Sequence, residues 1–240
     1  MRSIVRKTLQ VQFFIILVLA VTNVFGLDKP EAKRVPQSIK AESEFIINPE
    51  RTAVLIMDYE NDIIGMLPES VRTPLVEKAS LILQKARQDN IQVIYVVVRF
   101  RDGYPEVNPH NKLFSGLKQT GLLIEGKPGA EIDSRLAPQP CDILVTKRRV
   151  GAFSTTDLET ILRSKNINKL VMFGLSTSGV VLSTVRWAAD MDYSLAVVSD
   201  ASADRDSEVH RVLMEKVFPW QATILTTKEL LQAFDAKIVK

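Results

Sequence analysis

Two oppositely charged residues, Asp58 and Lys147, each follow a short apolar run typical of a buried strand. Asp58 comes directly after residues 53–57, and Lys147 comes two positions after residues 143–145. If both runs are parallel strands, the carboxylate and the ammonium emerge at the sheet edge where open α/β sheets bind ligands. Such a pair can hold both groups charged, and a transient proton on the aspartate can pass to a substrate. The alternatives are a turn or capping role for Asp58 and a simple salt bridge.

A turn rich in serine and threonine follows another apolar run, residues 170–173. It contains Gly174, Ser176, Thr177, Ser178 and Gly179, and a helical pattern follows it directly. The first turn of such a helix presents unpaired backbone N–H groups that can hold an oxyanion or a carboxylate. Ser178 can cap this helix, and we favour that role over a nucleophilic one.

The elements that must position these residues are alternating strands and helices. Short apolar runs rich in β-branched residues indicate buried parallel strands at residues 53–57, 92–98, 143–145, 170–173, 195–198 and 223–225. Apolar residues spaced three or four apart indicate amphipathic helices within residues 75–86, 158–162, 181–188 and 209–217. This alternation predicts a three-layer, doubly wound α/β sandwich around one mostly parallel sheet.

The start of the chain has the three parts of a signal peptide. Arg2, Arg6 and Lys7 precede an apolar run at residues 11–21, and Gly26 marks a plausible cleavage point. An uncleaved anchor is the alternative, but the run is shorter than the about 20 residues that a membrane-spanning helix needs. We therefore expect a signal peptide at residues 1–26, an arm at 27–49, a single domain at 50–240, and a secreted or periplasmic protein with no stable membrane anchor.

Composition argues against several kinds of partner and cross-link. The full chain holds 31 basic and 28 acidic residues, and residues 1–26 contain three basic residues and no acidic one. The remaining chain is therefore neutral, which gives no support for a nucleic-acid partner. Cys141 is the one cysteine, so no internal disulfide can form. Trp187 and Trp220 are candidates either for an interface between copies of the chain or for the core.

Taken together, these segments resemble the isochorismatase-like hydrolases, which include nicotinamidases, other small-amide cysteine hydrolases and isochorismatases. The likeness covers residues 50–230 and rests on three motifs: Asp58 with Asn61 and Asp62, Lys147 with residues 151–153 and 156–158, and Gly174 with Thr177. Asp200 and Ala201, which end the next strand, also fit. The resemblance implies that Asp58 is the acid/base, that Lys147 orients and stabilises charge, and that the Leu175–Ser176 peptide is cis. The resemblance also implies a site that binds the substrate or an oxyanion, formed by Asn61, Phe153, Thr177, Ser178, Gly179 and Val180.

The chain departs from the amidase branch of that family at the nucleophile. The branch has a cysteine three residues after the threonine that matches Thr177, and Val180 stands there in this sequence. Cys141 precedes its strand and so lies toward the opposite sheet edge. The amidase branch also often carries several histidines beside its active site, whereas this chain has only His110 and His210. We expect no metal or other cofactor, and we interpret Asp102 and His110 as loop or substrate-contact residues.

Three functions remain open on the sequence. The first is hydrolysis of a small molecule of enol-ether type, in which Asp58 donates a proton and water attacks without a covalent intermediate. The second is a catalytically silent protein that binds a small molecule in the same crevice. The third is amide hydrolysis by directly activated water, which is harder because an amide is the poorer electrophile. The presence of both Asp58 and Lys147 favours an enzyme, and a homo-oligomer is possible.

Overall fold

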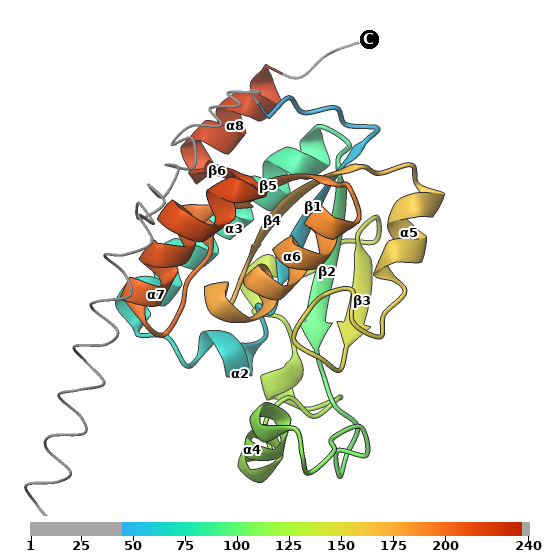
Figure 1. The fold of residues 1–240 in the computed structure, drawn as a ribbon, viewed down its shortest axis with the longest axis vertical. Helices are drawn as coiled ribbons and strands as arrows, with labels where there is room; N and C mark the ends of the chain where they lie inside the picture. Colours follow the sequence, from blue (N-terminus) through green and yellow to red (C-terminus); the bar gives the residue numbers. More distant parts are fainter. Residues whose placement is uncertain (1–44, 237–240) are drawn as a thin grey trace, which may run out of the picture. The chain divides into compact units, whose positions relative to one another are not determined.

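Six parallel strands form one sheet in the computed structural model, which describes residues 45–236 (Figure 1). Their order across the sheet is β3-β2-β1-β4-β5-β6, and every neighbouring pair is parallel. Each predicted apolar run lies within one strand, so the predicted α/β sandwich is confirmed. The strands are β1 (Thr52–Met57), β2 (Gln92–Val98), β3 (Ile143–Lys147), β4 (Lys169–Gly174), β5 (Ser194–Val198) and β6 (Thr223–Leu225).

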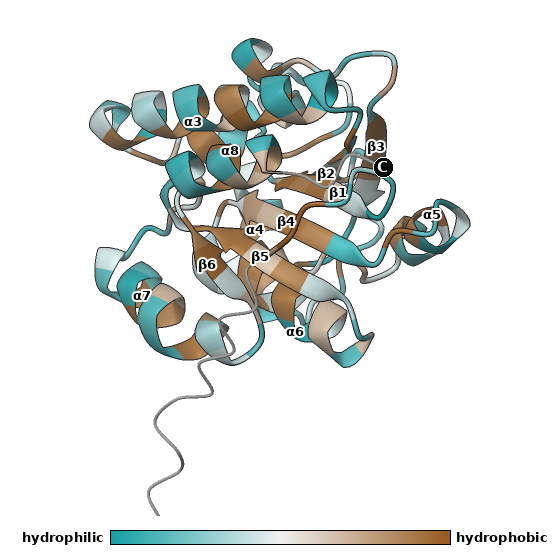
Figure 2. Ribbon diagram, turned by 90° about the horizontal axis from the view of Figure 1, so that it is seen from above, coloured by the Kyte–Doolittle hydropathy of each residue, from teal (hydrophilic) through white to brown (hydrophobic). Residues whose placement is uncertain are grey.

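Helices cover both faces of this sheet, because its strands are apolar on both sides. Helices α3 (Glu69–Gln88) and α8 (Thr227–Asp235) pack on one face. Helices α5 (Leu158–Ser164) and α6 (Leu182–Asp190) pack on the other, together with the π-helical turn Leu213–Val217 that continues α7 (Ser207–Val212). Figure 2 shows α3 and α8 on one side of the strands and α6 and α7 on the opposite side.

Two further helices lie near the carboxyl ends of the strands. These are α2 (Asn61–Ile64) and α4 (Lys112–Thr120). Phe114 of α4 belongs to a third apolar cluster, with Phe100, Tyr104 and Leu123. Figure 1 shows the arrowheads of β2 and β3 directed toward the end of the sheet where α2 and α4 lie. The remaining helical turns are Pro128–Ala130, Ser134–Leu136, Thr177–Val181, Ser199–Ala201 and Phe218–Trp220.

The last residues of the expected arm pack against the domain. Phe45 and Ile47 are buried in the core, and Lys169 Nζ donates a hydrogen bond to the carbonyl oxygen of Ile46 at 2.9 Å. The predicted signal peptide and the rest of the arm lie outside the described residues. Within residues 45–236, no helix combines the length and apolar character that crossing a membrane requires.

Both tryptophans lie at the surface of the domain, so the core interpretation of these residues is wrong. Trp220 is 67% exposed, and Trp187 is 49% exposed although its ring stacks on Phe153 with centroids 6.4 Å apart. Their positions leave the interface interpretation open.

Candidate active site

The structure brings Asp58 and Lys147 into direct contact at the carboxyl ends of β1 and β3. Lys147 Nζ donates a hydrogen bond to Asp58 Oδ2 at 2.8 Å. Lys147 is 1% exposed and Asp58 6% exposed. The second carboxylate oxygen, Asp58 Oδ1, is buried and has no hydrogen-bond partner within the described chain. Asp58 also lines the adjoining pocket, so its carboxyl group is the candidate for proton exchange with a ligand there.

The backbone around β1 fixes the position of Asp58. The sheet order reverses between β1 and β4, and ligands of doubly wound folds bind at such a switch point. The amide of Asp58 donates to the Val96 carbonyl at 2.9 Å, and Asp58 has a φ of 60°, a sparsely populated region for a residue with a side chain. On the other side, Gly174 allows close approach of β4, because a Cβ there would lie 2.7 Å from the Met57 carbonyl oxygen.

A second carboxylate, Glu60, lies close to this pair, and sequence reasoning did not single it out. Glu60 is fully buried, and its Oε1 accepts a hydrogen bond from the amide of Val98 at the end of β2. Its other oxygen, Oε2, is buried without a hydrogen-bond partner in the described chain. The site therefore contains two buried carboxylates and one buried ammonium group.

Burial raises the pKa of both carboxylic acids. Burial raises the pKa of Asp58 to about 6, although the neighbouring Lys147 charge and hydrogen bond partly offset the shift. For Glu60, burial and the charge of Asp58 raise the pKa well above its ordinary value, and Lys147 again offsets part of the effect. A carboxyl group with a pKa near neutrality can act as a general acid under physiological conditions.

A cavity of about 350 Å³ adjoins the pair. Its wall includes Asp58, Lys147, Ser176, Ser178, Gly179 and Val180 from the strand ends and the turn after β4. Most of the remaining lining is apolar, with Ile63, Met66 and Leu67 on one side and Leu113, Phe114 and Leu117 of α4 on another. The volume suits a small molecule. Sequence reasoning missed this apolar wall, although Asn111 and Gly121 bracket α4 as helix-capping signals.

The turn after β4 differs in detail from the expected anion-binding helix start. The amides of Thr177, Ser178 and Gly179 donate to the Ala203 carbonyl, to Asp204 Oδ2 and to the Ser176 carbonyl. These three donors are therefore already used within the protein. The amide of Ser176, which belongs to a pocket-lining residue, makes no hydrogen bond with the described part of the chain.

Three side-chain features of this turn complete its description. The expected capping by Ser178 is wrong, because Ser176 occupies the N-cap position of the turn Thr177–Val181 and no side chain caps it. Thr177 is buried, and its Oγ1 lies 2.8 Å from Nδ1 of His210, outside the pocket lining. The Leu175–Ser176 peptide is cis, as the resemblance implied.

The structure does not bring Asn61 and Phe153 to the pocket. Asn61 donates to the Pro128 carbonyl at 2.8 Å and lines a separate cavity that contains neither Asp58 nor Lys147. Phe153 is buried between Trp187 and Tyr193, with ring centroids 6.4 and 6.2 Å away.

The lid and thiol candidates also lie elsewhere. Asp102 and His110 are exposed and do not line the cavity; α4 provides that wall instead. Cys141 is exposed ahead of the first residue of β3, whereas Lys147 is its last. The one thiol of the chain is therefore at the wrong end of the strand to act in the pocket.

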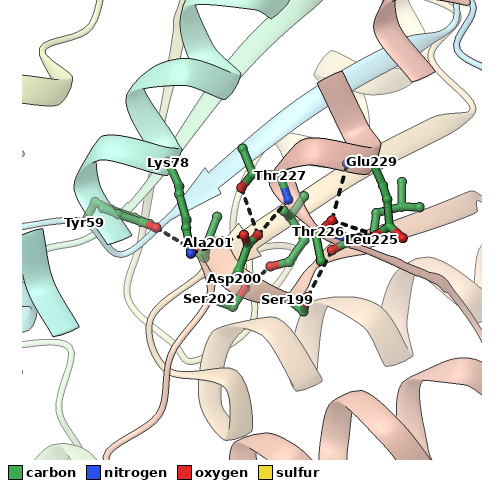
Figure 3. Close-up of polar contacts among 11 residues, drawn as sticks. Tyr59, Lys78, Ser199, Asp200, Ala201, Ser202, Leu225, Thr226, Thr227 and Glu229 are labelled. Atoms are coloured by element: carbon green, nitrogen blue, oxygen red, sulfur yellow. Dashed lines mark hydrogen bonds and ion pairs between the residues drawn. The ribbon is translucent and has the colours of Figure 1, made fainter. Parts of the chain in front are cut away.

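Asp200, which also fitted the resemblance, has a structural role. Its Oδ1 accepts hydrogen bonds from the amide and the hydroxyl of Thr227 at 2.7 and 2.8 Å, and its Oδ2 pairs with Lys78 of α3 at 3.2 Å (Figure 3). Tyr59 donates to the Ala201 carbonyl at 2.6 Å in the same region. These contacts join α3, α8 and the segment after β1. Asp200 therefore stabilises the elements next to the site but does not line the cavity.

Metal-binding side chains do not gather in the part of the chain that the structure describes. Residues 45–236 contain no group of three or more histidine, cysteine, aspartate or glutamate side chains placed to hold an ion. A typical zinc site uses at least three such ligands.

The doubly wound sandwich, with a buried acid–lysine pair and a small cavity at the switch point, has the arrangement in which open α/β proteins bind ligands. The pattern of the isochorismatase domain matches residues 52–229. The chain therefore belongs to the isochorismatase family of hydrolases.

Individual relatives agree with this placement. The chain is 30% identical over 192 residues to the uncharacterized isochorismatase family protein YwoC of Bacillus subtilis, covering 78% of this chain and 95% of YwoC. It is 28% identical to the ureidoacrylate amidohydrolase RutB of Rhizobium rhizogenes (83% and 91% covered) and 29% identical to a probable inactive nicotinamidase of Arabidopsis thaliana (66% and 84%). A crystal structure of a cysteine hydrolase from Pseudomonas syringae pv. phaseolicola superposes with a TM-score of 0.72 at 27% identity, covering 79% of this chain and 95% of that one.

Proposed function

We propose that the protein hydrolyses a small enol ether, with Asp58 as general acid and base and Lys147 as its charge partner. The Asp58 carboxyl protonates the terminal carbon of the double bond, and the carbon that bears the ether oxygen becomes an oxocarbenium ion. Water adds to that carbon and returns a proton to Asp58. The resulting hemiketal breaks its other C–O bond, which gives a ketone and an alcohol. No covalent enzyme intermediate is needed.

One observation carries this proposal: the buried ion pair leaves Asp58 Oδ1 without a partner beside a small, mostly apolar cavity. Lys147 holds the other oxygen, which fixes the position of the carboxyl group in the cavity wall. The wall from α4 is apolar, and displacement of water by a bound substrate there would strengthen electrostatic interactions. The test is turnover of enol ethers by the wild-type protein and by Asp58→Asn, described in the Discussion.

The absence of a thiol from the pocket favours this route over covalent amide hydrolysis. Val180, which stands where we place the family's cysteine, is buried in the cavity wall, and its side chain has no nucleophilic atom. Ser178 lines the cavity, but neither histidine of the chain does. A serine nucleophile normally needs such a base within hydrogen-bonding distance.

An arginine in the cavity lining supports an anionic substrate. Arg205 lines the cavity beside Asp204, whose Oδ2 accepts a hydrogen bond from the amide of Ser178. Within the described chain Arg205 forms no ion pair, and its one hydrogen-bond contact is with the sulfur of Met66. A guanidinium group free of carboxylates binds a carboxylate through two parallel hydrogen bonds. We therefore propose that the substrate carries a carboxylate in addition to the bond that breaks.

Arg205→Gln is expected to raise KM for a carboxylate-bearing substrate by about tenfold or more, with a much smaller effect on kcat. The loss should be small for the same substrate as its neutral methyl ester, because that molecule offers no charge to the guanidinium. Arg186→Gln is the matched control, since Arg186 is an exposed arginine bonded to Gln221 away from the cavity. Steady-state kinetics on both substrates decides the point, and equal losses for acid and ester would rule out carboxylate recognition.

Turnover is expected to survive both iodoacetamide and EDTA. Cys141 is exposed and should be alkylated fully, but it lies at the amino end of β3, remote from Lys147. Mass spectrometry would count the added groups while a parallel assay measures the rate. Loss of activity in proportion to alkylation, or on chelation with recovery on adding a divalent ion, would contradict the mechanism.

The two other functions are outcomes of the same experiments. The name of RutB describes an amidohydrolase, and that of the Arabidopsis relative a probable inactive enzyme. An amidase that uses water directly would turn over amides in preference to enol ethers. A binding protein would retain ligand affinity and show no turnover that depends on Asp58.

Export and self-association remain proposals. We propose that residues 1–26 direct export, that the mature chain is secreted or periplasmic, and that a small-molecule substrate, with no nucleic acid, is its ligand. A homo-oligomer is supported by the exposure of Trp187 and Trp220.

A further inference from the structure

The site contains one more buried carboxylate than it has buried cations. Asp58, Glu60 and Lys147 are all within the buried part of the site, and only Lys147 is positive. With all three groups ionised, the trio would carry a net negative charge away from water. One bound proton makes it neutral, which is the far less costly state in a region of low dielectric constant.

Two oxygen atoms are available for that proton. Asp58 Oδ1 and Glu60 Oε2 are both buried and without hydrogen-bond partners in the described chain. The other oxygen of each carboxyl group is already bonded, Asp58 Oδ2 to Lys147 and Glu60 Oε1 to the amide of Val98. An ionised carboxylate with a buried, unbonded oxygen is costly, and protonation removes most of that cost.

The proposed chemistry needs this proton. Protonation of an enol ether starts from the acid form of Asp58, whereas the adjacent Lys147 favours the ionised form. A second carboxyl group that shares the site can hold the proton while Asp58 is ionised. Transfer of the proton from the Glu60 carboxyl to the Asp58 carboxylate leaves the total charge unchanged.

We propose that Asp58, Glu60 and Lys147 act as one unit that carries a single proton on its two carboxylates at neutral pH, with Glu60 as the positioning residue that keeps this proton available to Asp58. Its catalytic consequence rests on the proposed function, whereas the proton content of the site does not. The two carboxylates titrate as a coupled pair, so the pH dependence belongs to the unit as a whole.

The groups around Glu60 are consistent with a protonated acid. Asp58 comes from its own segment, Lys147 from β3, and β2 contributes the amide of Val98. The segment that pairs with Glu60 through Ile132 carries Glu131, whose charge is matched by Arg99 at 3.2 Å. Among residues 45–236, Lys147 is therefore the one positive group that acts on both carboxylates, and it is already bonded to Asp58.

Infrared spectroscopy of the full-length protein at about pH 7.5 tests the proton content directly, since a protonated carboxyl group absorbs separately from carboxylates. The wild type is expected to show a buried carboxylic-acid band that Glu60→Gln removes. Glu106→Gln is the matched control: Glu106 Oε2 is also buried and unpartnered, but Arg101 and Arg148 pair with its other oxygen and hold its pKa below the usual value. That variant should keep the band.

The pH profile of kcat/KM provides the catalytic readout. In Glu60→Gln one carboxylate faces one ammonium, so Asp58 should lose its proton more readily and the alkaline limb should move down by about one pH unit or more. A merely structural role for Glu60 would lower the rate by the same factor at every pH.

The outcomes separate this inference from the proposed function. Absence of the acid band in the wild type, or its persistence in Glu60→Gln, overturns the inference whatever the activity. If Glu60→Gln fails to fold, the wild-type band alone decides. A band that behaves as expected in a protein without hydrolase activity would contradict the proposed function and leave the shared proton established.

Discussion

Asp58→Asn is expected to lower kcat by about 10²–10⁴-fold, the range that a positioned general acid contributes. Asparagine keeps the size of the side chain and can still bond to Lys147, but it has no transferable proton. It also tolerates the φ of 60° at this position better than most residues do. Substrate or product should therefore bind with nearly unchanged affinity, which calorimetry can measure beside the rate.

Asp142→Asn is the matched control for this variant. Asp142 forms a partly buried ion pair with Arg87 at 2.6 Å, just before the amino end of β3. Its loss should reduce stability without changing turnover per folded molecule. Comparable losses of kcat in Asp58→Asn and Asp142→Asn would indicate a stability effect and remove Asp58 from the mechanism.

Lys147→Met should cost about 3–5 kcal/mol of unfolding free energy near neutral pH, because it leaves the buried Asp58 carboxylate without a counter-ion. The cost depends on pH with a definite sign. The folded-state pKa of Asp58 lies above its ordinary value, so the folded protein binds more protons than the unfolded chain and stability falls as pH rises through about 4–6. Without Lys147 the pKa of Asp58 rises further. The loss of unfolding free energy in Lys147→Met should therefore be small near pH 5 and complete near pH 8.

Urea unfolding at both pH values measures this difference. Lys78→Met serves as the control, since Lys78 pairs with Asp200 in a partly exposed bridge worth about 1 kcal/mol or less. The control should show little change of its deficit between the two pH values. If Lys147→Met loses the same unfolding free energy at pH 5 and pH 8, Asp58 is not the group left unpaired.

The strands and the central pair could be predicted from the sequence because both follow from short-range patterns. Apolar runs set the strands, and parallel strands place their carboxyl ends at one edge, so Asp58 and Lys147 were expected at the same edge of the sheet. The structure adds the distance of 2.8 Å between them. The chain has α4 as well, which was missed because Gly116 interrupts a short apolar pattern, although Asn111 and Gly121 mark both its ends.

The rest of the site depends on contacts between distant segments. Asp204 bonds to the amide of Ser178 from 26 positions away, and no local pattern indicates that this donor is taken. Glu60 lies among polar residues typical of a solvated turn, yet pairing with Ile132 and Val98 buries it. The motif assigns Phe153 to the substrate side, whereas the structure places it in the apolar cluster beneath α5 and α6, beside the rings of Trp187 and Tyr193.

The most direct test of the mechanism is hydrolysis of carboxylate-bearing enol ethers in D₂O by wild type and Asp58→Asn, with analogous amides in parallel. Proton transfer from Asp58 to carbon predicts a ketone that carries one carbon-bound deuterium, formed by the wild type and lost with the Asp58→Asn rate; mass spectrometry of freshly quenched product measures it. Equal rates for the two proteins on every substrate, or turnover restricted to the amides, would contradict the account.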